Sequence, residues 1–69
     1  MPVQAIIFEK KHWSTIEARS WLKKKKYVPI KRVDITKNYY RYRILNPKKF
    51  KSFFIKKSRT KGIKYVIGT

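Results

Sequence analysis

Cysteine is absent from this 69-residue chain, glycine occurs twice, and only three residues are acidic. Without cysteine, the chain can form neither a disulfide nor a thiolate metal site. Its single histidine, His12, falls short of the four Cys or His ligands that structural zinc normally takes. Two glycines are too few for a glycine-rich phosphate loop. We therefore expect no metal site and no cofactor.

The shortage of acids also argues against catalysis. One of the three, Glu17, is accounted for by helix capping. A two-carboxylate site would then need Glu9 and Asp34 to converge in a pocket that so small a domain scarcely has room for. His12 is a possible base, but a histidine in the loop before a helix is far more often solvated. The sequence predicts a protein that is not an enzyme, with no catalytic residue.

Long apolar stretches are missing as well. The longest uncharged runs are short, for example Val3 to Phe8 and Val66 to Thr69. A membrane-spanning helix needs about 20 apolar residues, and no signal-peptide pattern is visible. Binding to a membrane surface is disfavoured because the few apolar residues of the expected helix are needed for the core. The sequence thus predicts no membrane partner.

What the chain has instead is a large positive charge together with enough hydrophobic residues to fold. Lysine and arginine number 20, and the formal net charge is +17, whereas small domains usually carry about 2 to 8 charges. Hydrophobic residues make up 42% and aromatic residues 16%, which is too many for a disordered tail. We expect one folded domain, residues 1–69, with a thin core. Solvated surface lysines and AT-rich coding account for part of the charge, and the rest indicates a polyanionic partner.

The strongest local signal is a helix start. Ser14 and Glu17 have the spacing of a capping box, with Ser14 as N-cap. The helix is expected from about Thr15 to Lys25, with lysines at its C-terminal end, where cations favour the helix dipole. Its inward face should hold Ala18, Trp21 and Leu22.

The remaining segments predict a sheet. Strands or extended segments are expected at Val3–Phe8, Tyr27–Ile30, Lys31–Thr36, Tyr39–Leu45, Phe53–Lys57 and Ile63–Ile67, with one helical turn at Pro47–Phe50. Gly62 is free to take a positive φ in the last hairpin. The sum is an α+β fold: one capped helix on a small, mainly antiparallel sheet of four to five strands, in β-α-β-β-β-β order.

Arginine and tyrosine alternate along residues 39–43 in a way that suits nucleic acid. Tyr39, Arg41 and Arg43 share one strand face, opposite Tyr40 and Tyr42. Arginine forks fit phosphate oxygens and guanine edges, and tyrosine rings stack on bases. The alternative is that the tyrosines are core residues and the lysines a solvated surface. The residues predicted to contact nucleic acid are Lys31, Arg32, Tyr39, Arg41, Arg43, Lys56, Lys57, Arg59 and Lys61.

Three segments carry a family resemblance. Residues 13–24 (WSTIEARSWLKK), 38–43 (NYYRYR) and 61–68 (KGIKYVIG) resemble a small domain of tailed phages and large DNA viruses. In phages this domain looks associated with prohead protease or capsid-morphogenesis regions. The resemblance covers nearly the whole chain and implies a viral α+β domain without supplying a catalytic residue. The extra lysines depart from the more balanced or acidic phage forms, which favours a charge-dependent role over a protease-linked one.

The combined expectation is a viral DNA-binding protein located in the virion or the host-cell interior. It would bind duplex DNA rather than RNA through the phosphates, with little sequence preference, in genome compaction or packaging. The alternatives are a virion structural protein that contacts capsid subunits and an RNA-binding protein associated with ribosomes. Dimerisation through Phe53, Phe54 and Ile55 is opposed by their flanking lysines, which leaves the oligomeric state open.

Overall fold

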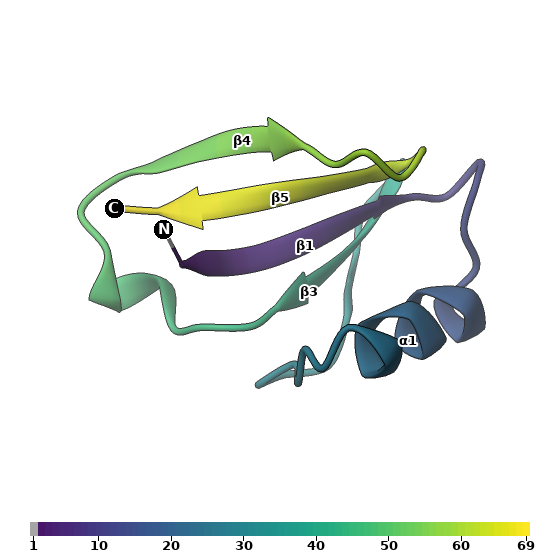
Figure 1. Cartoon of the computed structure of the whole chain (residues 1–69), viewed down its shortest axis with the longest axis horizontal. Coiled ribbons are helices and arrows are strands. Elements are labelled where there is room, and N and C mark those ends of the chain that lie inside the picture. Colours follow the sequence, from purple (N-terminus) through teal and green to yellow (C-terminus); the bar gives the residue numbers. More distant parts are fainter. Residues whose placement is uncertain (1) are drawn as a thin grey trace.

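One helix and five antiparallel strands make up the protein, as the computed structural model, which describes residues 2–69, shows (Figure 1). The elements are β1 (Val3–Glu9), α1 (Thr15–Lys24), β2 (Asp34–Ile35), β3 (Tyr39–Arg43), the 3-10 turn η1 (Pro47–Lys49), β4 (Phe53–Lys57) and β5 (Ile63–Gly68). The sheet order is β2-β3-β1-β5-β4, so β1 is central and β4 is an edge. The predicted α+β class, with one helix on a small antiparallel sheet, is confirmed.

Helix α1 begins and ends as its local sequence dictates. The Ser14 hydroxyl accepts a hydrogen bond from the Glu17 amide, and the Ser14 amide donates to the Glu17 carboxylate, both at 3.2 Å. The predicted capping box is therefore formed. At the other end, the Tyr27 amide donates to the Leu22 carbonyl and the Lys26 amide to the Lys23 carbonyl, which is a Schellman motif. Lys26 takes the left-handed position, with φ of 64°, where glycine is usual.

The core lies between α1 and one face of the sheet. Ala18 and Leu22 of the helix pack on Ile6, Phe8 and Tyr42, and all of them are buried. The Phe8 ring makes edge contacts with the rings of Trp13, Trp21 and Tyr42, with centroid distances of 5.3, 5.7 and 5.6 Å. Aromatic pairs of this kind stabilise a fold by about 0.5–1.5 kcal/mol each beyond the area they bury. This cluster fixes the helix on the sheet.

Residues 27–33 are more irregular than the sequence predicted. They form no strand, and only Asp34–Ile35 pair with β3. Pro29 has no amide hydrogen for a sheet ladder, and the Ile30 amide makes an isolated hydrogen bond of 2.9 Å to the Arg43 carbonyl. Strand β3 also ends at Arg43, before the predicted Leu45. The amides of residues 44 and 45 both donate to the carbonyl of Gln4 there, which interrupts the regular pairing.

Candidate nucleic-acid interface

The sheet has an open face on the side away from α1. Strand pairing places β3 residues 39, 41 and 43 beside residues 9, 7 and 5 of β1, and Lys64 of β5 lies on the far side of Ile7. Directly paired residues in an antiparallel sheet project from the same face. Tyr39, Arg41 and Arg43 therefore share the open face with Lys57 and Lys64, which are paired with each other. Their neighbour Tyr42 points into the core instead.

One of the two arginines of this face is already paired. Arg43 Nε lies 3.0 Å from Asp34 Oδ2, as an ion pair without the geometry of a hydrogen bond. A partly exposed pair of this kind contributes at most about 1 kcal/mol to stability, but it neutralises Arg43. Arg41 Nε is buried and has no hydrogen-bond partner among residues 2–69. The open face thus carries less free charge than the strand sequence suggests.

Three loops meet at one end of the sheet: residues 10–13, 36–38 and 58–62. We call these loops, together with the strand residues Glu9, Tyr39, Lys57 and Lys64 that border them, the loop end. The Glu9 amide donates to the Gly62 carbonyl at 2.8 Å, and the Lys10 amide donates to the Asn38 carbonyl at 3.0 Å. The Trp13 indole N–H donates to the Lys61 carbonyl at 2.9 Å. Each of the other two loops is therefore tied to residues 9–13, and Figure 1 shows their shared position at the right-hand end of the strands.

Close packing also fixes the last hairpin at the loop end. Gly62 has a φ of +79°, and a Cβ there would lie 2.9 Å from His12 Cβ and from atoms of the Trp13 indole. Only a residue without a side chain fits both the backbone conformation and this space. The loop end is thus a defined surface and not three independent loops.

Basic side chains from distant parts of the sequence converge at the loop end. The Lys64 ammonium lies 5.4 Å from the centroid of the Tyr39 ring, on the open face, and the Lys10 ammonium lies 5.5 Å from that of Tyr40, on the helix side. The acid of this region is Glu9, whose Oε2 lies 3.7 Å from His12 Nε2. Its carboxylate is far outnumbered. The cations of the loop end are Lys10, Lys11, Lys37, Lys57, Arg59, Lys61 and Lys64.

A hollow of about 430 Å³ lies within this surface, lined by residues 9–11 and 37–39. Lys10, Lys11 and Lys37 all contribute to its wall, next to Tyr39. Ammonium groups attract phosphate oxygens, and the three lysines outnumber Glu9, the one acidic residue of this lining.

The predicted contact residues divide among four places. Tyr39, Lys57, Arg59 and Lys61 lie at the loop end, and Arg41 adjoins it on the open face, whereas Arg43 is held by the ion pair. Lys56 projects from the helix side of β4, since it pairs with Tyr65. Lys31 and Arg32 line a groove elsewhere. The loop-end cations that were not among the predicted contacts are Lys10, Lys11, Lys37 and Lys64. Strand order brings the first three next to the last hairpin.

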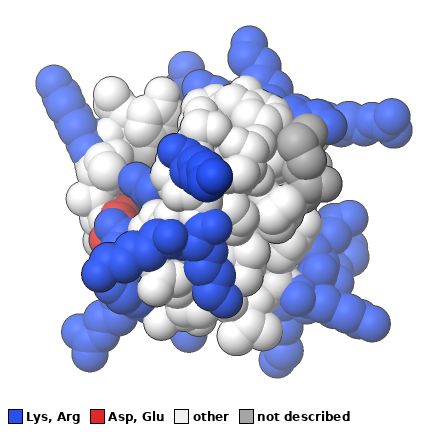
Figure 2. Space-filling view, turned by 90° about the vertical axis from the view of Figure 1, so that its left-hand side faces the viewer, with Lys and Arg blue, Asp and Glu red and all other residues white. Residues whose placement is uncertain are grey.

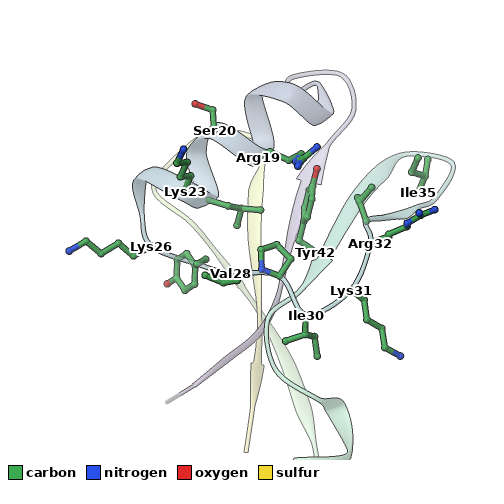
Figure 3. Close-up of a pocket in the computed structure, with 14 residues that line it drawn as sticks. Arg19, Ser20, Lys23, Lys26, Val28, Ile30, Lys31, Arg32, Ile35 and Tyr42 are labelled. Carbon is green, nitrogen blue, oxygen red and sulfur yellow. The ribbon is translucent and has the colours of Figure 1, made fainter.

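The groove lies between α1 and residues 26–35, with a volume of about 1250 Å³ (Figure 3). Its walls are apolar: Val28, Ile30 and Ile35 are 76%, 50% and 63% exposed. No acidic residue lines it within the described part of the chain. Its basic residues are Arg19, Lys23, Lys26, Lys31 and Arg32.

Tyr42 closes the inner end of the groove. Its hydroxyl donates to the Thr15 carbonyl over 3.4 Å, and Figure 3 shows the side chain pointing toward Arg19. Burial raises the pKa of Tyr42, an effect that the nearby charge of Arg19 opposes and that of Tyr40 reinforces. The phenol is therefore a neutral hydrogen-bond donor at physiological pH.

Positive charge is not confined to these two regions. Figure 2 views the end of the molecule opposite the loop end and shows lysine and arginine side chains projecting around its periphery. Basic side chains also lie in front of the middle of that face, and acidic atoms are visible in one place, at its left. What distinguishes the loop end is that its basic residues stand on loops tied to one another by backbone hydrogen bonds.

Among residues 2–69 no cluster of His, Asp or Glu is arranged to hold a metal ion, and α1 is neither long nor apolar enough to cross a membrane. No protein-family model, curated protein or solved structure matches the chain.

Proposed function

We propose that this protein is a non-catalytic nucleic-acid-binding protein that holds duplex DNA by its phosphates, through the loop end and the adjoining part of the open face. The observation that carries the proposal is that six lysines and Arg59, from residues 10–11, 37 and 57–64, are brought to one end of the sheet around a single acid, Glu9. Such a cluster raises the local potential, attracts a polyanion and gains affinity from released counterions. The repulsion among these positive charges opposes folding, and a bound polyanion reduces that repulsion.

The kinds of residue present favour phosphates over base edges. Lysines outnumber arginines at the loop end, and an ammonium contacts phosphate as a point charge, whereas arginine reads guanine with two parallel hydrogen bonds. Helix α1 packs through Ala18 and Leu22 on the other face of the sheet, so it cannot serve as a recognition helix for the open face. We therefore infer binding with little sequence preference.

Tyr39 bears on the choice between duplex and single strand. Base stacking on a single strand needs a free aromatic face. Lys64 occupies a position over the Tyr39 ring, and Lys10 lies over the ring of Tyr40, which packs against the core on the helix side. Stacking would require these ammonium groups to move, whereas phosphate contact uses them where they are. This favours duplex DNA over single-stranded RNA.

A role in compacting or packaging a viral genome is the biological form of this proposal. It combines sequence-independent phosphate binding with the resemblance of residues 13–24 and 38–43 to a domain of phages and large DNA viruses. Ribosomal RNA and acidic capsid surfaces are the competing partners, and the test below includes both.

The test is a binding series at several salt concentrations. Random duplex DNA, single-stranded DNA, structured RNA and an acidic polypeptide would be titrated against the protein, with fluorescence anisotropy as the readout. We expect duplex DNA to bind most tightly, independently of sequence, with a slope of log affinity against log salt of about −5 to −6 for six or seven phosphate contacts. A flat salt dependence, or tighter binding of RNA or polypeptide, would contradict the proposal.

A further inference from the structure

Strand β4 is an exposed edge with apolar side chains on both of its faces. Phe53, Phe54 and Ile55 are 45%, 41% and 55% exposed, and Figure 1 shows β4 outermost in the sheet. An uncovered edge of this kind is a template for another strand. The Phe53 ring also packs edge-on against Phe50, with centroids 5.9 Å apart, so the edge is held in place.

The backbone groups that face outward can be assigned from the pairing. The Ser58 amide donates to the Ile63 carbonyl, and the Thr69 amide donates to the Ser52 carbonyl. Because hydrogen-bonded residues alternate along an antiparallel strand, residues 54 and 56 bond toward β5. Phe53, Ile55 and Lys57 then direct their N–H and C=O groups to the free edge.

We propose that β4 pairs antiparallel with β4 of a second copy, in a register centred on Ile55. In this register Ile55 faces the partner's Ile55, and Phe53 faces the partner's Lys57. All the outward groups of the strand are then matched, because each such pair exchanges two N–H···O hydrogen bonds. On the other face, Phe54 lies opposite the partner's Lys56.

The lysines of β4 select this register. A pairing centred on Lys56 would place it directly against the partner's Lys56, which is unfavourable. A pairing centred on Phe54 would set Lys57 against the partner's Lys51, whose amide already donates to the Thr69 carbonyl at 2.9 Å. Centring on Ile55 sets each lysine beside a phenylalanine ring instead. There its stem covers the ring, and its ammonium can approach the ring face.

The pairing has two consequences for the shape of the assembly. Facing residues of an antiparallel pair lie on the same side, so the two five-stranded sheets join into one, with both helices on one side and both open faces on the other. Because the strands run in opposite directions, the two loop ends point away from each other. The dimer would therefore present two separate basic ends, an arrangement suited to bridging two duplexes.

Salt separates this inference from the proposed function. Just beyond the strand ends, Lys51 comes near the partner's Arg59, and each copy carries a net charge of +17. Screening by salt weakens that repulsion, so dimerisation should strengthen as salt rises. Binding to DNA should weaken over the same range.

The first test is sedimentation equilibrium of the full chain at 0.1 and 0.5 M salt, following about 1 to 300 μM protein, a range chosen to span micromolar dissociation constants. We expect a monomer–dimer equilibrium that shifts toward dimer at the higher salt. Ile55→Lys puts a lysine against a lysine at the two-fold axis, and we expect it to weaken dimerisation at least 10-fold. Ile16→Lys is the matched control, because Ile16 of α1 is 81% exposed and the change in charge is the same.

Circular dichroism of both variants shows whether they are folded. A wild-type protein that stays monomeric over the whole range would overturn the inference, as would equal dimerisation of the two folded variants.

The second test fixes the register by cross-linking, which is clean because the chain has no cysteine. Ile55→Cys should form a covalent dimer on mild oxidation, since directly facing Cα atoms lie about 5.5 Å apart. Phe54→Cys alone should not, because its own copy lies on the diagonal at about 7–8 Å. A mixture of Phe54→Cys and Lys56→Cys should cross-link. Efficient cross-linking of Phe54→Cys alone would overturn the register.

Discussion

The loop end and the groove are both cationic, but the residues among which the charges lie differ: they are polar at the loop end and apolar in the groove. At the loop end, the lysines project from loops that are joined by backbone hydrogen bonds. Tyr39 and Glu9 lie beside these lysines. In the groove, Lys23, Lys31 and Arg32 surround exposed apolar side chains such as Val28. One surface is suited to a hydrated polyanion, and the other to a ligand that is both apolar and anionic.

This difference shows that net charge alone does not locate a binding surface. Each region holds several cations and few or no acids, so a count of charges would rank them alike. The surface beneath the charges separates them. A phosphate keeps part of its hydration when it binds and needs polar surroundings, whereas exposed valine and isoleucine gain only from apolar contact.

The comparison is tested most strongly by removing equal charge from each region. A loop-end variant carries Lys37→Gln, Arg59→Gln and Lys61→Gln. Each lost phosphate contact lowers the salt slope by about 0.9, so this variant should lose duplex affinity about 100-fold or more at 0.1 M salt. The slope itself should fall by nearly 3. Fluorescence anisotropy across a salt series gives both quantities.

The matched groove variant carries Lys23→Gln, Lys31→Gln and Arg32→Gln, which removes the same two lysines and one arginine. We expect it to lose duplex affinity by less than about 5-fold, through the general loss of positive potential. Lys31 and Arg32 were themselves predicted to contact nucleic acid, so the pair of variants also tests that prediction. Equal losses in the two variants would mean that the loop end has no special role.

Gly62→Ala should break the loop end without changing any charge. The added Cβ meets His12 and Trp13 at 2.9 Å, and the backbone φ of +79° is costly for alanine. We expect the free energy of unfolding to fall by about 2–3 kcal/mol, as judged from denaturant titration. A folded variant at low temperature should also bind DNA more weakly, because the hairpin that carries Arg59 is displaced. Unchanged stability would show that the hairpin is not fixed as described.

Part of this fold could be predicted because its signals are local. The capping box depends only on Ser14 and Glu17, and the alternation of residues 39–43 sorts Tyr42 into the core and Arg41 onto the open face. Gly62 was likewise identified from its position in a hairpin. In each case neighbours in sequence decide the conformation, so no tertiary knowledge is needed.

The rest depends on contacts between distant segments. Lys26 occupies a left-handed position that sequence rules reserve for glycine, because the Schellman hydrogen bonds hold it there. Lys10 and Lys37 join the loop end because β1 and β3 are neighbours in the sheet, which the sequence does not state. The ion pair of Arg43 with Asp34 has the same origin, since β2 pairs with β3.

Replacing apolar residues of the groove should give a smaller effect, which tests whether the groove binds an apolar anion. An anionic naphthalene sulfonate dye combines an apolar ring with a negative charge, and such dyes report exposed apolar surface. Val28→Ser together with Ile30→Ser should reduce dye fluorescence severalfold while changing unfolding free energy by less than about 1 kcal/mol, because both residues are largely exposed. The loop-end variant should leave the dye signal unchanged. Loss of the signal in that variant instead would place the dye site at the loop end.

The smallest effect concerns Tyr42, which lies under the groove and is 3% exposed. Its pKa is raised above the ordinary 10.0, mainly by burial. Below pH 10 the phenol is protonated in both the folded and the unfolded states, so its ionisation does not affect stability. Above pH 10 the unfolded chain loses this proton first, and the free energy of unfolding falls as pH rises through the folded pKa.

Tyr42→Phe isolates that contribution from those of the other tyrosines and the lysines. At neutral pH the variant loses a long hydrogen bond to the Thr15 carbonyl, so we expect it to be less stable by up to about 1 kcal/mol. Between pH 10 and 11.5 the difference in free energy of unfolding between the variant and the native protein should shrink. Only the native protein has an ionisable group at residue 42, so only it loses stability through that ionisation. Urea titrations at successive pH values measure it. A difference that stays constant over this range would show that burial does not raise the pKa of Tyr42, and that the inner end of the groove is open to water.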